Sequence, residues 1–475
     1  MIGSAGGGPP PAAVALIDGE HYPPVVVDAL QALAHRFSFL AALFLGGFEK
    51  IKGDDLAATA ARIYGLPVHF PGPSGVEGAL RQVVDTYRPS VIVDLSDEPV
   101  VGYRERFRLI SHALARGVAY EGSDFRFSPP RLDRLATNPS LSIIGTAKRV
   151  GKTALSGYVA RIMEDHLRES TERWVNEGSG IVIVAMGRGG PAEPEIIDGG
   201  ARVLTANDLL EWSRAGRHAA SDHFEDAALS RMTTVGCRRC GGGMAGEPFV
   251  SNVAEGARVA NGLGPALTIF EGSGAALPPV ATDARMLVAG AHQPLEYVTG
   301  YLGTYRVLVS DAVVLTMAEE PLADAARVAR LVEEVQAIKK DVPVIPVVFR
   351  PRPMEPIDGR TVALFTTAPA SQEPVLRRYL EERYGCKVLA FSDRLSDRAG
   401  LREDLARPEV DKAELLLTEI KAAAIDVVAE EADRRGVPTI FLDNIPIETG
   451  GAREGELAET CRHLAHTAAR RYGSA

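Results

Sequence analysis

The stretch Ser142-Ile-Ile-Gly-Thr-Ala-Lys-Arg-Val-Gly-Lys-Thr-Ala154 decides the fold of this chain. An apolar strand enters a loop that ends in Gly151-Lys152-Thr153, and an apolar-periodic helix follows from Ala154 to about His166. The N–H groups of such a loop and of the helix N-terminus bind phosphate oxygens. In this order of residues, Lys152 reaches the β- and γ-phosphates and the Thr153 hydroxyl ligates Mg2+. The stretch therefore predicts a phosphate-binding P-loop.

The loop departs from the usual pattern G-x-x-x-x-G-K-[ST] at its first glycine. Position 146 is Thr146, and Gly145 stands just before it. The alternative is a chance Gly-Lys-Thr at a strand–helix turn, but the strand before it and the helix after it are the context that the motif requires. We therefore expect the whole run to bind nucleotide: Gly145, Thr146, Ala147, Lys148, Arg149, Val150, Gly151, Lys152 and Thr153.

Short apolar runs alternate with helical periods on both sides of the loop. Strand-length runs such as Ser90–Ser96 and Ile181–Met186 are separated by helices, which implies crossover connections and parallel sheets. The predicted class is α/β, with an N-terminal Rossmann-like parallel-sheet domain followed by a larger doubly wound domain that carries the P-loop. The predicted boundaries are a mobile leader at 1–12, the N-terminal domain at 13–135, and the P-loop domain at 136–475 with a C-terminal lobe at 352–475.

Composition limits the classes of protein. The 475 residues are 46% hydrophobic and 24% charged, which is globular, and the net charge is −10. An acidic chain lacks the broad positive field that nucleic acid requires. Four cysteines are too few for a disulfide framework and suit a reducing compartment. With neither a signal-like N-terminus nor an apolar run of about 18 residues, we expect a cytoplasmic protein without a membrane segment.

Several polar residues near strand ends are candidates for chemistry. Glu271 follows an apolar strand in Phe270-Glu-Gly-Ser-Gly274 and would hold the metal; the alternative is a solvated strand end. Arg188 lies in a glycine-rich turn and would clamp an anion, with Glu193 or Glu195 facing a metal or water. Further candidates for metal, proton or anion work are Lys148, Arg149, Arg104, Arg106, Arg108, Arg126, Asp222 and His223, each of which has a plain structural alternative.

The pair Cys237-Arg-Arg-Cys240 resembles half of a zinc site, but no second pair of ligands lies near it in the sequence. A cationic loop, with Arg238 and Arg239 folding over a polyanion, is the preferred interpretation. Lys421 would pair with Asp426 or face solvent. The segments at Thr366 and at Leu442-Asp-Asn444 would contact the nucleotide base. The N-K-x-D pattern of GTPases is missing from both, which favours ATP.

The loop Gly145-Thr-Ala-Lys-Arg-Val-Gly-Lys-Thr153 resembles that of dethiobiotin synthetases, whose Glu-Gly-x-Gly pattern supplies a magnesium ligand. Further loops make the chain resemble the cyclic 2,3-diphosphoglycerate synthetase family from Ile17 to about Pro446. They are Leu16-Ile-Asp-Gly-Glu-His-Tyr-Pro23, Gly187-Arg-Gly-Gly-Pro-Ala-Glu-Pro-Glu195, Gly236-Cys-Arg-Arg-Cys-Gly-Gly-Gly243, Phe270-Glu-Gly-Ser-Gly274 and Val309-Ser-Asp-Ala312.

The resemblance implies a ligase that uses ATP and Mg2+ to convert 2,3-diphosphoglycerate into its cyclic phosphoanhydride, with ADP and phosphate released. Catalysis then falls to Lys152, Glu271, Lys148 and Arg188, and metal binding to Thr153 and Glu271. The expected substrate-binding residues are Asp18, His21, Arg104, Arg126, Arg188, Arg238 and Arg239.

Two other functions stay open: another P-loop kinase or ligase acting on an oxygen acid, and a nucleotide-driven metal-delivery NTPase that loads metal at Cys237 and Cys240. The expected partner is the small-molecule substrate, without nucleic acid or membrane, and a homodimer stays open.

Overall fold

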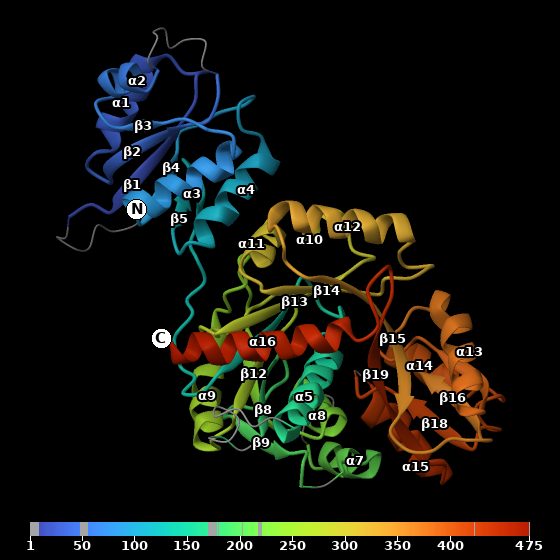
Figure 1. The fold of residues 1–475 in the computed structure, drawn as a ribbon. Coiled ribbons are helices and arrows are strands. Elements are labelled where there is room, and N and C mark those ends of the chain that lie inside the picture. Colours follow the sequence, from blue (N-terminus) through green and yellow to red (C-terminus); the bar gives the residue numbers. More distant parts are fainter. Residues whose placement is uncertain are drawn as a thin grey trace. The chain divides into compact units, whose positions relative to one another are not determined.

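A computed structural model describes residues 9–47, 56–169, 178, 180–201, 203–216, 221–421 and 423–474 (Figure 1). Most of the predicted leader therefore lies outside the described residues. The chain divides into two compact units. Unit one comprises Met1–Pro130 and Pro294–Val309, and unit two comprises Arg131–Gln293 and Ser310–Ala475. No helix in the described ranges is long and apolar enough to cross a membrane.

Unit one is built on a six-stranded sheet in the order β3-β2-β1-β4-β5-β6, parallel except for β6. The chain moves outward from β1 through β2 to β3, then returns to the other side of β1 for β4 and β5. The switch point of the sheet therefore lies between β1 and β4, where the ends of open α/β sheets bind ligands. Its strands are β1 (Ala12–Ile17), β2 (Ser38–Phe44), β3 (Val68–His69), β4 (Val91–Asp94), β5 (Ala119–Glu121) and β6 (Arg126–Phe127).

The helices of unit one include two from a distant part of the sequence. Sequence analysis assigned residues 294–309 to the P-loop domain, but they fold with unit one. The Tyr301 ring packs edge-on against Phe107, with centroids 5.4 Å apart, and the Ser111 hydroxyl donates to the Tyr301 carbonyl (3.3 Å). The helices are α1 (Pro23–Leu33), α2 (Leu56–Tyr64), α3 (Gly75–Tyr87), α4 (Tyr103–Leu114), α10 (Leu295–Val298) and α11 (Gly303–Leu308).

The described strands of unit two form one large sheet, in the order β11-β10-β8-β12-β7-β13-β14-β15-β19-β18-β16-β17, with β9 paired to β10. The strands are β7 (Ser140–Gly145), β8 (Ile181–Gly187), β9 (Glu195–Asp198), β10 (Thr233–Cys240), β11 (Val250–Ser251), β12 (Leu267–Glu271), β13 (Ala284–Gly290), β14 (Ala312–Thr316), β15 (Val344–Pro353), β16 (Thr361–Phe365), β17 (Lys387–Ser392), β18 (Leu415–Thr418) and β19 (Thr439–Glu448).

The helices of unit two are α5 (Lys152–Glu169), α7 (Ala206–Arg214), α8 (Asp222–Ser230), α9 (Val253–Gly262), α12 (Ala325–Ile338), α13 (Glu373–Tyr384), α14 (Arg398–Leu405), α15 (Glu430–Arg435) and α16 (Glu456–Gly473), with short turns η2 (Ala370–Gln372) and η3 (Ala424–Ala429). Helices α5 and α16 cover one face of the central strands, and α9 covers the opposite face of β8 and β10. The predicted doubly wound α/β class is confirmed.

Burial on both faces explains the sequence of the central strand. β7 is flanked by β12 and β13, and all six of its residues are buried. Parallel strands covered by helices on both sides are apolar along their whole length, rather than alternating. The P-loop follows β7 directly, so the strand order places it at the middle of the sheet's carboxyl edge.

The C-terminal part of the sheet has a switch point of its own. β19 runs antiparallel to β15, and β18, β16 and β17 then follow in parallel. The chain passes from β16 out to β17 and returns to the other side of β16 for β18. The ends of β16 and β18 therefore meet at a position where α/β sheets bind ligands.

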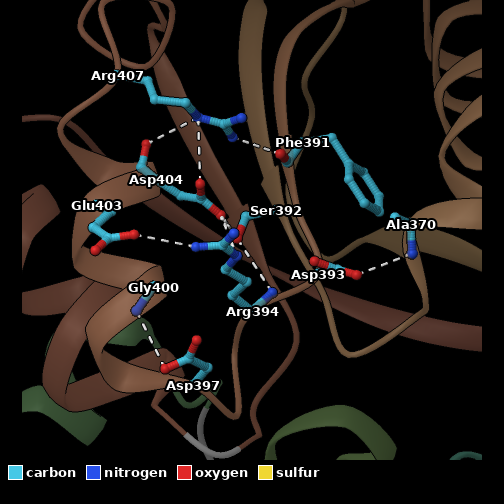
Figure 2. Close-up of polar contacts among 10 residues, drawn as sticks. All are labelled: Ala370, Phe391, Ser392, Asp393, Arg394, Asp397, Gly400, Glu403, Asp404 and Arg407. Carbon is cyan, nitrogen blue, oxygen red and sulfur yellow. Dashed lines mark hydrogen bonds and ion pairs between the residues drawn. The ribbon is translucent and has the colours of Figure 1, made fainter.

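Polar contacts around the end of β17 fix the loop that follows β16 (Figure 2). The Ala370 N–H of that loop donates to Asp393 Oδ2 (3.0 Å), and the Ser392 hydroxyl donates to Asp404 Oδ2 (2.6 Å). Arg394 is held between Glu403 and Asp404. The loop after β16 is therefore tied to its neighbour and holds a defined position at the switch point.

Candidate active site

The phosphate loop curls tightly over β7. Arg149 and Gly151 adopt the left-handed conformation, with φ of 62° and 88°. A side chain at Gly145 would crowd Lys152, because its Cβ would lie 2.8 Å from Lys152 Cδ. Thr146 replaces the first glycine of the usual P-loop pattern, and the structure shows why a threonine fits. Its φ is not in the left-handed region, and its hydroxyl donates to Gln293 Oε1 (2.5 Å). Glycine is therefore not required at position 146.

Lys152 lies back over the loop. It is buried, and Nζ donates to the Ala147 carbonyl (3.0 Å). Burial lowers the pKa of Lys152 to about 8, and the negative charges of Glu271 and Asp222 act in the opposite direction. A phosphate bound in the loop would favour the charged ammonium group.

Thr153 and Glu271 form the centre of the candidate metal site. The Thr153 hydroxyl donates to Glu271 Oε1 (2.8 Å), while Glu271 Oε2 is buried, receives no donor among the described residues, and belongs to a carboxyl group that lies against Asp226. Burial raises the pKa of Glu271. A buried carboxylate oxygen beside a hydroxyl is the oxygen donor set that Mg2+ prefers, and Mg2+ takes its remaining ligands from phosphates and water. The two residues therefore fit the metal.

Asp226 is a buried acid that the sequence analysis missed. It lies on α8, and its carboxyl group is buried against that of Glu271 with no donor from another described residue. Burial and the contact with Glu271 raise the pKa of Asp226 well above the usual value. The pattern Asp-His-Phe-Glu-Asp drew attention only to its first two members. Asp226 and Glu271 are therefore two buried acids that act on each other, and a cation beside Glu271 would reduce the cost of burying them.

Two arginines lie together beside the metal site. A Cβ at Gly274 would lie 2.7 Å from Arg188 Nη2 and 3.4 Å from Arg239 Nη2, so both guanidinium groups lie over this glycine. Arg239 donates to the carbonyls of Gly241 and Ser273 (2.8 and 2.7 Å), and its pKa is lowered by burial and by Arg188. Asp222 lies near enough to act on Arg239 in the opposite direction, and the two adjacent guanidinium groups together form a candidate site for an anion.

The phosphate loop, the metal site and the end of the C-terminal sheet share one cavity of about 480 Å3. The P-loop side contributes Lys148, Arg149 and Lys152, and Arg188 and Glu271 lie beside it. The C-terminal part of unit two contributes Thr366, Thr367, Gln372, Glu419, Lys421, Leu442 and Asn444. The expected base-contact segments at Thr366 and Asn444 therefore do border the cavity.

Other candidates lie elsewhere or have structural partners. Lys421 does not pair with Asp426, as one sequence alternative had it: it lies 3.2 Å from Glu225 Oε1, and Asp426 pairs with Arg398. His223 is buried, with Nε2 3.4 Å from Glu195 Oε2. Glu193 and Arg238 are exposed and do not border the cavity, whereas Asp222 does.

The switch point of unit one is polar but already well connected. The buried Asp18 carboxylate accepts hydrogen bonds from the His21 ring (2.9 Å) and from the Asp97 N–H (2.6 Å). At the end of β4, Asp94 accepts from Arg106 Nε (2.8 Å) and from the Tyr120 hydroxyl (2.7 Å). His21 and Asp18 therefore do lie together at this edge of the sheet.

The two arginines expected to bind substrate in this unit, Arg104 and Arg126, have no recorded contact with Asp18 or His21. Arg104 is exposed on the first turn of α4. Arg126 follows β5, which is parallel to β4, but it begins the antiparallel strand β6 and pairs with Glu121. Glu121 also pairs with Arg36, so both acceptor oxygens of this carboxylate are engaged.

The two cysteines of the C-x-x-C pair lie on β10 but in different surroundings. Cys237 is buried in the core beneath α9, while Cys240 is exposed. Residues three apart in a strand point to opposite faces of the sheet, so one metal ion does not reach both thiols. Burial also raises the pKa of the Cys237 thiol to about 12. Within the described ranges, no group of three or more His, Cys, Asp or Glu side chains is arranged to hold a metal ion.

Comparison with known proteins gives consistent results. Three family models match, for the P-loop domain (residues 140–348), the N-terminal domain (12–128) and the C-terminal domain (353–445) of cyclic 2,3-diphosphoglycerate synthetase. The protein of that name from Rubrobacter xylanophilus is 52% identical over 439 residues, covering 92% of this chain and 94% of its own length. The one from Methanothermus fervidus is 43% identical over 438 residues, covering 91% and 92%.

The similarity extends to a third relative of the same name, from Methanothermobacter thermautotrophicus. It is 42% identical over 446 residues, covering 93% of each chain. Among solved structures, a DUF1611 family protein from Anabaena variabilis aligns over 89% of this chain and 99% of its own, with 10% identity. Its TM-score is 0.17, too low to carry an argument.

Proposed function

Because the chain belongs to the cyclic 2,3-diphosphoglycerate synthetase family, we propose that it closes a phosphoanhydride within 2,3-diphosphoglycerate while ATP is converted to ADP and phosphate. The chain is an enzyme of the ligase type with a P-loop domain. The proposal concerns the substrate, the products and the residues that act on them.

The reaction needs an activated phosphate, because joining two anionic phosphates is unfavourable. One oxygen of a substrate phosphate attacks the γ-phosphorus of ATP, and ADP leaves. An oxygen of the other substrate phosphate then attacks the phosphorus that carries the new phosphoryl group, which closes the ring and expels inorganic phosphate. Neither step requires a covalent bond to the enzyme. Positioning and charge neutralisation carry the catalysis.

The residues of the cavity divide this work. The loop from Gly145 to Thr153 and the ammonium group of Lys152 hold the donor phosphates. Thr153 and Glu271 would hold Mg2+, which neutralises charge on the β- and γ-phosphates. Arg188, which lines the cavity, and Arg239 beside it are placed to bind a phosphate of the acceptor. The observation that carries the proposal is this pair of guanidinium groups in the neighbourhood of the P-loop and the candidate metal site.

The proposal is tested by incubating the protein with ATP, Mg2+ and each of several phosphorylated glycerates, while ADP release is followed. We expect ADP to be released only when the glycerate added is 2,3-diphosphoglycerate. The product of that reaction should show the 31P signal of a cyclic phosphoanhydride. Release with a monophosphorylated glycerate, without a cyclic product, would favour another kinase or ligase of oxygen acids. Release that no glycerate stimulates would reject the proposal.

The metal-delivery alternative has little support. Its loading site would need both Cys237 and Cys240, and the first is in the core while the second is at the surface. Elemental analysis of the purified protein checks this alternative. About one zinc per chain, lost on Cys240→Ser, would favour metal delivery.

A further inference from the structure

Lys421 brings a cation from the C-terminal part of unit two into the cavity of the phosphate loop. It stands three residues after β18 and lies 3.2 Å from Glu225 Oε1 on α8. Lys421, Glu225 and Lys152 all border the same cavity of about 480 Å3. The sequence does not predict the contact between Lys421 and Glu225, because the two residues are 196 positions apart.

A network of hydrogen bonds fixes the turn that carries Lys421. Glu419 is buried and accepts hydrogen bonds from the hydroxyls of Thr366 (2.9 Å) and Thr367 (2.7 Å) and from Asn444 Nδ2 (3.0 Å). These donors come from the ends of β16 and from β19, so Glu419 ties three strands together at the switch point. Such a position is where an α/β sheet presents groups to a ligand.

The charge of Lys421 is maintained without a ligand. Burial opposes the charged form, but Glu225 and Glu419 raise the pKa of Lys421 above its usual value. Lys421 also adds to the positive potential at Lys152, whose pKa it helps to lower. Two ammonium groups that repel each other across one cavity are both stabilised when an anion binds between them.

The ion pair with Glu225 can be exchanged for a phosphate. The Lys421 side chain is 29% exposed and can turn into the cavity, whereas the Glu225 side chain is only 6% exposed, so Glu225 must lose its charge if Lys421 leaves it. Burial raises the pKa of Glu225 and Lys421 acts to lower it, so this carboxyl group can take up a proton when the ammonium group leaves. A phosphate offers Lys421 a doubly charged acceptor instead.

We propose that Lys421 leaves Glu225 and binds a phosphate group of the acceptor substrate, across the cavity from the donor phosphates held by Lys152. The acceptor's identity as 2,3-diphosphoglycerate rests on the proposed function. The placement of Lys421 does not, since it follows from the cavity and the ion pair alone.

The test compares Lys421→Met with Lys421→Arg, and uses Lys412→Met as the matched control, because Lys412 is an exposed lysine near the same strand. Pyrophosphate serves as a simple probe of the acceptor site. It is titrated calorimetrically into protein saturated with Mg2+ and ADP. We expect Lys421→Met to weaken pyrophosphate binding about ten- to a hundredfold, the usual loss for a hydrogen bond to a charged group. Lys421→Arg should keep part of the native affinity for pyrophosphate, and Lys412→Met should leave that affinity unchanged.

Steady-state kinetics adds a readout that a purely structural ion pair would not move. Lys421→Met should raise KM for 2,3-diphosphoglycerate, while the Kd of ATP stays within about threefold of the native value. Glu225→Gln should lower KM for the acceptor, because Lys421 then starts unpaired. If Glu225→Gln and Lys421→Met impair the protein alike, with equal losses of melting temperature, the pair is structural and the proposal is wrong.

The two proposals fail in different ways. A native protein that binds pyrophosphate through Lys421 but does not turn over 2,3-diphosphoglycerate would reject the proposed reaction and keep the anion site. Equal pyrophosphate affinity in the native protein and in Lys421→Met, or no measurable affinity in either, would overturn the role of Lys421 whatever the acceptor is.

Discussion

The Thr153 hydroxyl donates a hydrogen bond of 2.8 Å to Glu271 Oε1, although 118 residues separate the two in sequence. The bond exists because β12 pairs directly with β7 in parallel, so the end of β12 stands beside the loop that follows β7. Neighbouring strand ends thereby bring together a hydroxyl and a carboxylate that Mg2+ can share. Both residues were expected to be metal ligands from sequence, and the site they would form remains a prediction for experiment.

The first prediction concerns this carboxylate. Glu271→Gln keeps the size of the side chain but removes an anionic ligand, so the Mg2+ concentration that gives half-maximal activity should rise by at least about tenfold, the scale found for altered metal ligation. The Kd of ATP should change much less. Activity measured against Mg2+ concentration checks this. Glu255→Gln on the surface of α9 is the control. If the Mg2+ dependence of Glu271→Gln is unchanged, Glu271 does not bind the metal and only ends a strand.

Lys152 gives a prediction for both rate and pH. Lys152→Ala should lower kcat by about 10²–10³-fold or more with the melting temperature nearly kept, because charge near the transferring phosphate acts in the transition state. In the native protein the pKa of Lys152 is lowered to about 8, so the free enzyme loses this charge as pH rises through 8. kcat/KM for ATP should therefore fall above that pH. A near-native kcat in Lys152→Ala would remove the loop from the mechanism.

Gly274 allows Arg188 to be moved without being removed. A Cβ at Gly274 would lie 2.7 Å from Arg188 Nη2, and this flexible side chain would have to shift. We expect Gly274→Ala to raise KM for the acceptor about tenfold, from the loss of one charged hydrogen bond. Gly264→Ala is the matched control, since Gly264 has nearly the same φ (61° against 60°) with no atom within 4 Å of an added Cβ. Equal effects of the two changes would show backbone strain alone.

The switch point of unit one is tested through His21. If it takes part in substrate binding, His21→Ala should raise KM for 2,3-diphosphoglycerate about ten- to a hundredfold and leave KM for ATP nearly unchanged. Arg126→Ala should have a smaller effect, because its guanidinium group already pairs with Glu121. Each substrate is varied in turn. Effects on neither substrate would leave Arg188 and Arg239 as the binding site for the diphosphate.

His112 predicts how unit one responds to acid. It is buried on α4, its Nδ1 has no hydrogen-bond partner, and burial with nearby arginines lowers its pKa to about 4. Between pH 6.5 and about 4, His112 is protonated in the unfolded chain but neutral in the folded chain. The contribution of this group to the free energy of unfolding is therefore fully present above pH 6.5 and is lost as the pH falls through this range. The loss should reach up to about 3 kcal/mol. His112→Leu should remove this part of the acid dependence of unfolding, and an unchanged profile would contradict the assignment.

The sequence by itself determined the elements and the chemistry of single loops. Apolar runs with turn residues between them predict strands and helices because burial and backbone geometry act over a few residues. The P-loop can be recognised from the sequence for the same reason, because its strand, loop and helix follow one another along the chain. The family resemblance drawn from these loops is confirmed by relatives that are 42% to 52% identical over most of the chain.

The contacts between residues far apart in the chain come from the folded arrangement of strands and helices. Residues 294–309 fold with unit one, Lys421 meets Glu225, and Arg239 joins Arg188 over Gly274. Cys237 and Cys240 are close in sequence yet separated by the alternation of a strand. These outcomes depend on strand order and on which face of the sheet each helix covers. That order is set by the packing of the whole core, and local periodicity does not record it.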